Sequence, residues 1–195
     1  MSIVSASKTS QSTHSFIHGF SEIRPFLYIC GYYAITGQKI KDLQITYAID
    51  ASNILTAPRI PDVQYLYVRV DDDDISDIKK YFADTSMFIK TAKDAVRGGK
   101  ILVYCAAGIS RSATLCIMYL VIQENLSLRD AFNVVQNSRP GITPNLSFWR
   151  QMIEYESEKR GKSSVKFIKK YQISFPDVYL KNLNKRQKKK FCVIF

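Results

Sequence analysis

The fold is organised around residues 100–120, KILVYCAAGISRSATLCIMYL. The apolar, β-branched start of this stretch predicts a strand, the small residues after Cys105 predict a tight loop, and the apolar residues after Arg111 predict a helix. Where such a loop runs into a helix N-terminus, successive backbone N–H groups converge on one point and the helix dipole adds positive potential there. The stretch therefore predicts a strand, an anion-binding loop and a helix in direct succession.

The residue types in this loop suit a phosphate dianion. Cys105 lies at its base, where the positive potential that favours phosphate also favours a thiolate. The planar guanidinium of Arg111 can bind two phosphate oxygens, and Ser112 can donate a hydrogen bond to the sulfur, which makes it a better leaving group in a second step. Small side chains let the backbone approach the ligand, and the predicted phosphate-binding residues are Ala106, Ala107, Gly108, Ile109, Ser110 and Arg111.

The sequence VYCAAGISRSAT resembles the signature loop of the protein tyrosine phosphatase superfamily, Cys-x5-Arg-Ser/Thr. Its AGxSRSxT pattern is similar to that of the dual-specificity branch. The likeness runs from about residue 20 to about residue 180 and is to the small, atypical members of that branch. A bare Cys and Arg six residues apart arise often by chance, whereas the complete loop between a strand and an amphipathic helix is specific. One residue departs from the family pattern, because Tyr104 stands where the family usually has His.

The resemblance implies an α/β fold with a central, mostly parallel sheet flanked by helices and the loop at the C-terminal end of a strand. It implies hydrolysis of phosphotyrosine and phosphoserine/threonine through a phosphocysteine on Cys105, with no cofactor. The substrates it implies are phosphoproteins, protein kinases among them. His14 and His18, the only histidines, lie near the N-terminus and do not predict a metal site.

Two other functions are open at this point. A phosphoinositide phosphatase would suit a membrane location, but Ala106, Ala107 and Ile109 supply none of the extra positive charge that inositol-phosphatase loops carry. A phosphoprotein-binding module with weak activity is the second alternative. The presence of both Cys105 and Arg111 argues against it.

A run of four aspartates, residues 71–74, follows the predicted strand at residues 63–70. The family takes its general acid, which protonates the leaving oxygen, from an Asp just past this strand. Matching YLYVRVDD to the family's strand selects Asp72, with Asp73 and Asp74 as alternatives. Asn145 matches a family position that braces the signature loop, although a polar residue in the first turn of a helix needs no such role.

The other strands and helices are read from apolar periodicity and turn residues. FLYICGYYA, residues 26–34, predicts an edge strand and turn, and ITYAIDAS, residues 45–52, predicts an inner strand. Cys116 and Trp149 are predicted to pack in the core. Helices are predicted at residues 78–96, 127–138 and 143–160, with Gly98, Pro140 and Gly161 at their ends.

Charge is distributed unevenly along the chain. Residues 1–158 hold 16 Lys+Arg and 16 Asp+Glu, whereas residues 159–195 hold 12 Lys+Arg and a single acid, Asp177. We expect a Ser/Thr-rich flexible leader at residues 1–20, a catalytic domain at 21–160, a C-terminal extension of that domain at 161–180, and a polybasic tail at 181–195.

The tail ends in CVIF, which fits a C-a-a-X prenylation box on Cys192. Basic residues stand just upstream, and a prenyl chain with several basic residues makes a two-part anchor for an anionic membrane. A nuclear-localisation run or a nucleic-acid patch ending in a chance cysteine is the alternative; position at the C-terminus favours prenylation and no nucleic acid. The basic residues are Lys181, Lys185, Arg186, Lys188, Lys189 and Lys190.

The scattered cysteines, the lack of an apolar leader and the lack of a spanning apolar run predict a cytoplasmic protein held peripherally on the cytosolic face of a membrane. Ser2 in place of Gly excludes N-myristoylation. The sequence makes no prediction of an oligomeric state.

Overall fold

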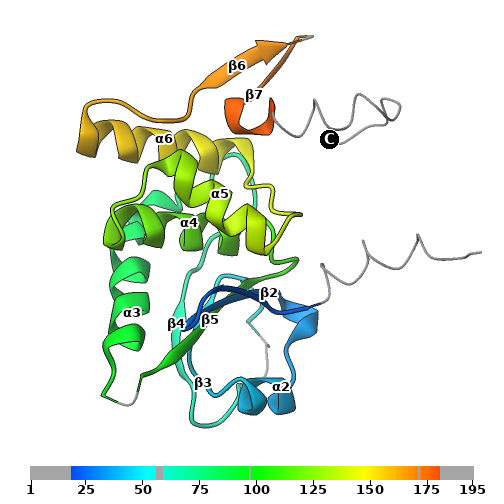
Figure 1. The fold of residues 1–195 in the computed structure, drawn as a ribbon. Coiled ribbons are helices and arrows are strands. Elements are labelled where there is room, and N and C mark those ends of the chain that lie inside the picture. The colour runs from blue at the N-terminus through cyan, green and yellow to red at the C-terminus, as the bar shows by residue number, and fades with distance from the viewer. Residues whose placement is uncertain (1–18, 56–58, 97, 171, 181–195) are drawn as a thin grey trace, which may run out of the picture.

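The computed structural model describes residues 19–55, 59–96, 98–170 and 172–180, whose main feature is a five-stranded sheet (Figure 1). β1 is antiparallel to β2, whereas β2, β5, β3 and β4 are parallel, which confirms the predicted mostly parallel α/β class. The spatial order is β1 (Ser21–Arg24), β2 (Leu27–Gly31), β5 (Lys100–Cys105), β3 (Ile45–Asp50) and β4 (Gln64–Tyr67).

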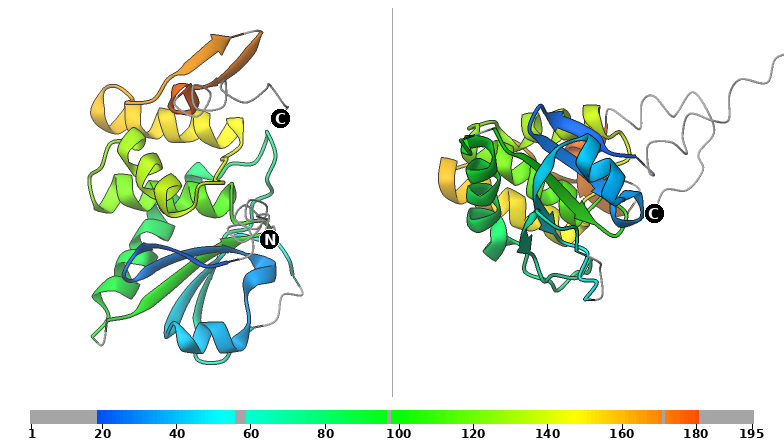
Figure 2. Two further views of the ribbon diagram at one scale, coloured as in Figure 1. Left: turned by 45° about the vertical axis from the view of Figure 1, so that its right-hand side comes forward. Right: turned by 90° about the horizontal axis from the view of Figure 1, so that it is seen from below.

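Helices cover both faces of this sheet. α2 (Gly37–Asp42) lies on one face, below the strands in Figure 1. The other face packs against the longer helices, and Figure 2 shows them stacked as a layer on that side. They are α3 (Phe82–Asp94), α4 (Arg111–Gln123), α5 (Leu128–Ser138) and α6 (Leu146–Arg160).

The central strand β5 carries the signature loop at its C-terminal end. Its residues alternate between two apolar cores: Val103 and Cys105 belong to the core under α3–α6, whereas Leu102 and Tyr104 belong to the smaller core under α2. α4 leaves the loop through the larger core, and Cys116 and Trp149 are fully buried there, as predicted.

The prediction of an edge strand at residues 26–34 is wrong. β2 lies between β1 and β5, and all five of its residues are buried. The true edges of the described sheet are β1 and β4. β1 covers the flank of β2, but it is four residues long and Ile23 is its only buried residue, so the sequence gives no strand pattern there.

The longer helices are correctly predicted in type, whereas the short α2 was not predicted. α3 begins at Phe82 rather than residue 78, because residues Lys79–Tyr81 form a 3-10 turn. α3 stops at Asp94, and Val96 beyond it is fully exposed rather than part of the apolar face. α6 begins at Leu146 rather than residue 143, because the side chain of Asn145 caps it by accepting the N–H of Phe148 at 2.8 Å. Gly161 ends α6 in the left-handed conformation at φ 77°, as predicted.

Residues beyond α6 form the hairpin β6 (Phe167–Lys170) and β7 (Ile173–Pro176), which projects past α6 in Figure 1, and a 3-10 turn (Asp177–Tyr179). Trp149 donates its indole N–H to the Tyr179 hydroxyl at 2.9 Å. Arg129 donates to the carboxylate of Asp177 at 2.8 Å. These contacts attach the segment after Gly161 to α5 and α6.

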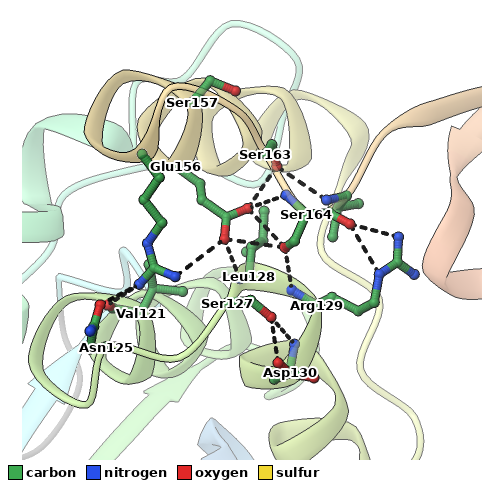
Figure 3. A network of polar contacts seen from close by, with 12 residues as sticks. Val121, Asn125, Ser127, Leu128, Arg129, Asp130, Glu156, Ser157, Ser163 and Ser164 are labelled. Carbon is green, nitrogen blue, oxygen red and sulfur yellow. Dashed lines mark hydrogen bonds and ion pairs between the residues drawn. The ribbon is translucent and has the colours of Figure 1, made fainter.

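A buried carboxylate strengthens this attachment (Figure 3). Glu156 of α6 is 1% exposed, and its oxygens accept the N–H of Leu128 at 2.7 Å, the N–H of Ser164 at 2.7 Å and the hydroxyl of Ser163 at 2.8 Å. Burial acts to raise the pKa of Glu156, but the hydrogen bonds from these backbone and hydroxyl groups together lower it below its usual value. Glu156 therefore joins three segments as an ionised group.

Replacing Glu156 with Gln should lower the free energy of unfolding at pH 7 by about 1–3 kcal/mol, because the Gln amide turns two N–H donors toward groups that are themselves donors. A lowered native pKa stabilises the fold above the unfolded-state value of about 4.3, and this contribution is lost as pH falls through the native value. Urea unfolding at pH 7 and below pH ~4 should show the deficit shrinking in acid.

Glu158→Gln on the same helix is the matched control. Glu158 is exposed and pairs with Lys79 at 2.7 Å, so its loss should change stability by less than about 0.5 kcal/mol. Equal effects of the two substitutions at pH 7 would contradict the structural role of Glu156.

Candidate active site

The signature loop, residues 105–111, lies directly on β2. Gly108 has φ 73°, and a Cβ there would lie 2.4 Å from the carbonyl carbon of Cys30. A Cβ on Gly31 would lie 2.9 Å from the carbonyl oxygen of Ala107. Gly108 is thus required for packing against the neighbouring strand as well as for its backbone conformation, a reason that the sequence alone does not give.

The carbonyl groups of the loop are held from outside. Tyr32 donates its N–H to the Ala106 carbonyl at 3.0 Å, and Thr143 donates to the Ile109 carbonyl at 2.9 Å. In a planar trans peptide the N–H points opposite to the C=O, so these contacts turn N–H groups toward the loop centre. Within the part of the chain that the structure describes, four of these N–H groups have no acceptor, those of Ala106, Ala107, Ile109 and Ser110.

Arg139, at the end of α5, also holds the loop, and the sequence analysis did not identify it. Its side chain is 1% exposed, and it donates to the carbonyls of Gly108 at 2.7 Å and Ala107 at 3.3 Å. Burial lowers the pKa of this guanidinium from its usual value. An arginine directly before Pro140, at the end of an amphipathic helix, was the only sequence signal.

Cys105 lies under the centre of the loop and is 1% exposed. Its Sγ accepts the N–H of Gly108 at 3.2 Å, and the Ser112 Oγ lies 3.2 Å from it. Both are donors that a thiolate can accept from. The structure therefore places Ser112 where the sequence analysis expected it, beside the sulfur.

Arg111 is anchored on one side of its guanidinium. It is 7% exposed, and its Nη1 donates to the carbonyls of Ser52 at 3.0 Å and Val70 at 3.3 Å. Its Nε is buried without a hydrogen-bond partner. Anchoring one nitrogen to two carbonyls leaves the Nε side for an oxyanion, which is the bidentate geometry that phosphate needs.

Asp72 is the aspartate that contacts the loop. Its Oδ1 accepts the Ser110 hydroxyl at 2.6 Å and the Asn145 side-chain amide at 2.7 Å, and its Oδ2 lies 3.9 Å from Arg111 Nε. Asp73 instead caps the next turn, accepting the N–H of Ser76 at 2.7 Å, and hydrogen bonds from Ser76 lower its pKa. Asp74 is exposed.

Asn145 has both of the roles considered from the sequence, a polar residue at the start of a helix and a brace of the signature loop. Its side-chain oxygen caps α6, and its amide donates to Asp72, while its backbone N–H donates to the Ser110 hydroxyl at 3.1 Å. One residue thus connects the start of α6, the aspartate and the signature loop. The direct contact with Asp72 had no sequence signal, because the two residues lie 73 positions apart.

Tyr104 faces away from the sulfur. It belongs to the core under α2, and it is 4% exposed. Burial raises the pKa of its hydroxyl, and a hydrogen bond with Asp50 and the charge of that carboxylate raise it further. Tyr104, which stands where the family usually has His, therefore lies on the opposite face of the sheet from the Cys105 sulfur.

Three further expectations concern metals and membranes. No group of three or more His, Cys, Asp or Glu side chains suited to a metal is found among the described residues. Within those same ranges no helix is long and apolar enough to span a bilayer. Cys192 and the polybasic tail lie outside the described residues.

The arrangement of free amides, guanidinium and thiol suits a tetrahedral dianion held against a nucleophilic sulfur. The sequence matches the family described as "Dual specificity phosphatase, catalytic domain" over residues 27–158. The chain belongs to this family and is a dual-specificity protein phosphatase, an enzyme that acts on phosphotyrosine and on phosphoserine or phosphothreonine.

Individual relatives support the same assignment. The chain is 44% identical to dual specificity protein phosphatase 14 of Mus musculus over 137 residues, 70% of this chain and 68% of that protein. It is 34% identical to human dual specificity protein phosphatase 18 over 168 residues, 86% and 88% of the two chains. The crystal structure of a mouse putative dual specificity phosphatase complexed with zinc tungstate is 32% identical, with a TM-score of 0.66 over 82% of this chain and 96% of that one.

Proposed function

We propose that this phosphatase works through a phosphocysteine on Cys105 and is held on the cytosolic face of a membrane by a prenyl group on Cys192. The observation that carries the chemistry is the set of four loop N–H groups that have no acceptor among the described residues, together with Arg111 Nε, which is buried without a hydrogen-bond partner. Together they supply donors for the three phosphate oxygens that do not react.

In the first step, the Cys105 thiolate attacks phosphorus in line with the bond to the substrate oxygen. The S–P bond forms, the P–O bond breaks, and the departing oxygen takes a proton from Asp72. In the second step, a water molecule attacks phosphorus while the Asp72 carboxylate takes its proton. The S–P bond breaks, inorganic phosphate leaves and the thiolate returns. Ser112, 3.2 Å from the sulfur, stabilises the thiolate as it departs.

The substrate class is tested by a panel of phosphotyrosine, phosphoserine and phosphothreonine peptides beside phosphoinositides. We expect the peptides to be hydrolysed in preference, because Ala106, Ala107 and Ile109 add no positive charge for an inositol polyphosphate. Preferred hydrolysis of phosphoinositides would overturn the choice of protein substrates. Phosphopeptide binding without turnover would favour the binding-module alternative.

The tether rests on sequence and on the charge of the last described segment. After residue 158 the described part of the chain contains only one acid, Asp177, and Arg129 already neutralises it with a contact at 2.8 Å. The positive charge of this segment adds to that of the tail. Each basic residue near an anionic leaflet contributes about 1 kcal/mol.

Cys192→Ser should move the protein from the membrane fraction to the soluble fraction of cells, because a basic tail without a prenyl chain holds the membrane weakly. Fractionation at physiological salt measures this, and we expect at least a roughly tenfold drop in the membrane-bound share. Cys30→Ser, which leaves the tail unchanged, is the control. A wild-type protein found in nuclei rather than on membranes, or a Cys192 variant that stays on membranes, would contradict the tether.

A further inference from the structure

Asp50 is a buried carboxylate that none of the proposed steps uses. It is the last residue of β3 and is 4% exposed. Its Oδ1 accepts both the N–H of Ser52 at 2.9 Å and the Ser52 hydroxyl at 2.6 Å. Tyr104 is its partner in the register between β3 and β5, so the two side chains are cross-strand neighbours.

The turn that Asp50 closes contacts the active site twice. The Ser52 carbonyl accepts Arg111 Nη1 at 3.0 Å. Asn53, held at φ 58°, donates its side-chain amide to Asp71 at 2.6 Å, directly before Asp72. An Asp side chain that binds the N–H two residues on fixes the direction of the intervening peptides. The Ser52 hydroxyl, which Asp50 holds, also accepts the N–H of Ile54 at 3.2 Å, so Asp50 helps to fix the peptides on both sides of the one that carries the Ser52 carbonyl.

We propose that Asp50 is a positioning residue for phosphate binding, acting through Ser52 to hold the Arg111 guanidinium with its Nε edge toward the signature loop. This rests on the proposed function, in which Arg111 binds the phosphate oxygens. Without the Asp50 acceptor the backbone at Ser52 is less constrained, and the Arg111 Nη1 depends on its longer hydrogen bond to the Val70 carbonyl at 3.3 Å. The guanidinium then has to be ordered by the ligand itself, which weakens phosphate binding.

The test compares Asp50→Ala with Asp50→Asn. Asn keeps the Oδ1 acceptor and the turn, whereas Ala removes it. We expect the dissociation constant for inorganic phosphate, measured by calorimetry, and the KM for p-nitrophenyl phosphate to rise about tenfold in Asp50→Ala. In Asp50→Asn both should stay within about threefold of the wild-type values.

Glu156→Ala is the matched control, because Glu156 is also a buried carboxylate that accepts a backbone N–H and serine hydroxyls, but in the attachment of the C-terminal segment. It should lower the melting temperature without changing phosphate affinity. If Asp50→Ala fails to fold, Ser52→Ala, which removes one of the two donors to Asp50, should still weaken phosphate binding about two- to threefold.

Wild-type phosphate affinity in folded Asp50→Ala, or in Ser52→Ala where the first does not fold, would overturn the proposal. An Asn variant as impaired as the Ala variant would also overturn it, because the acceptor would then not be what matters. Phosphate binding is measured without turnover. An inactive wild-type protein would therefore refute the proposed reaction, but the phosphate affinities of the wild type and the Asp50 variants could still be compared.

Discussion

Cys105→Ser is expected to abolish turnover of phosphopeptides while leaving inorganic phosphate bound. The serine hydroxyl stays protonated near neutral pH and cannot replace a thiolate as nucleophile. The phosphate oxygens are bound elsewhere, by the loop amides and by the Nε edge of Arg111. We expect the rate to fall at least about 10⁴-fold, as when other nucleophiles of this kind are removed.

Cys116→Ala is the matched control for this experiment. Cys116 is fully buried in α4, and burial raises the pKa of its thiol well above the usual value, so it is neutral and serves packing. Its loss should cost stability and leave turnover within about threefold. With the wild type, the initial burst of released leaving group should equal one phosphocysteine per active site. Measurable turnover by Cys105→Ser, or loss of turnover in Cys116→Ala alone, would contradict the assignment.

The structure around Cys105 follows closely from the local sequence. Strand, loop and helix are consecutive, so a few residues of alternating and then helical apolar pattern predict all three. The loop was predictable for the same reason, since its shape depends on Gly108 and its position on the strand before it. The mostly parallel character of the sheet followed from the family resemblance, but the order of its strands did not, since β2 was expected at an edge.

The residues that orient the site were not predictable in this way. Arg139 contacts Gly108, 31 positions away, and Asn145, although expected near the loop, contacts Asp72 across 73 positions. Asp50 binds the nearby Ser52, but Ser52 in turn contacts Arg111, 59 positions on. A periodic pattern reports which face of an element is apolar, and a buried polar contact breaks that pattern without naming its partner. The role of Glu156 was also not predictable, because the serines that bind its carboxylate, Ser163 and Ser164, lie beyond the end of α6.

Asp72→Asn is expected to reduce kcat for phosphotyrosine and phosphoserine peptides by about 10²-fold or more, because the leaving oxygen then has no proton donor. The loss should be smaller with p-nitrophenyl phosphate, whose leaving group is a better anion. KM should change little, since Arg111 and the loop amides remain.

Asp73→Asn and Asp74→Asn are the matched controls, because they remove the same charge from the same loop. Asp73 instead accepts the N–H groups of Ile75 at 3.1 Å and Ser76 at 2.7 Å, which hold its carboxylate in the following turn. Asp72 is the one of the three that the hydroxyl of Ser110 and the amide of Asn145 bring to the loop. Both controls should keep activity within about threefold. A hundredfold loss in either control, with Asp72→Asn nearly normal, would transfer the role of general acid to that residue.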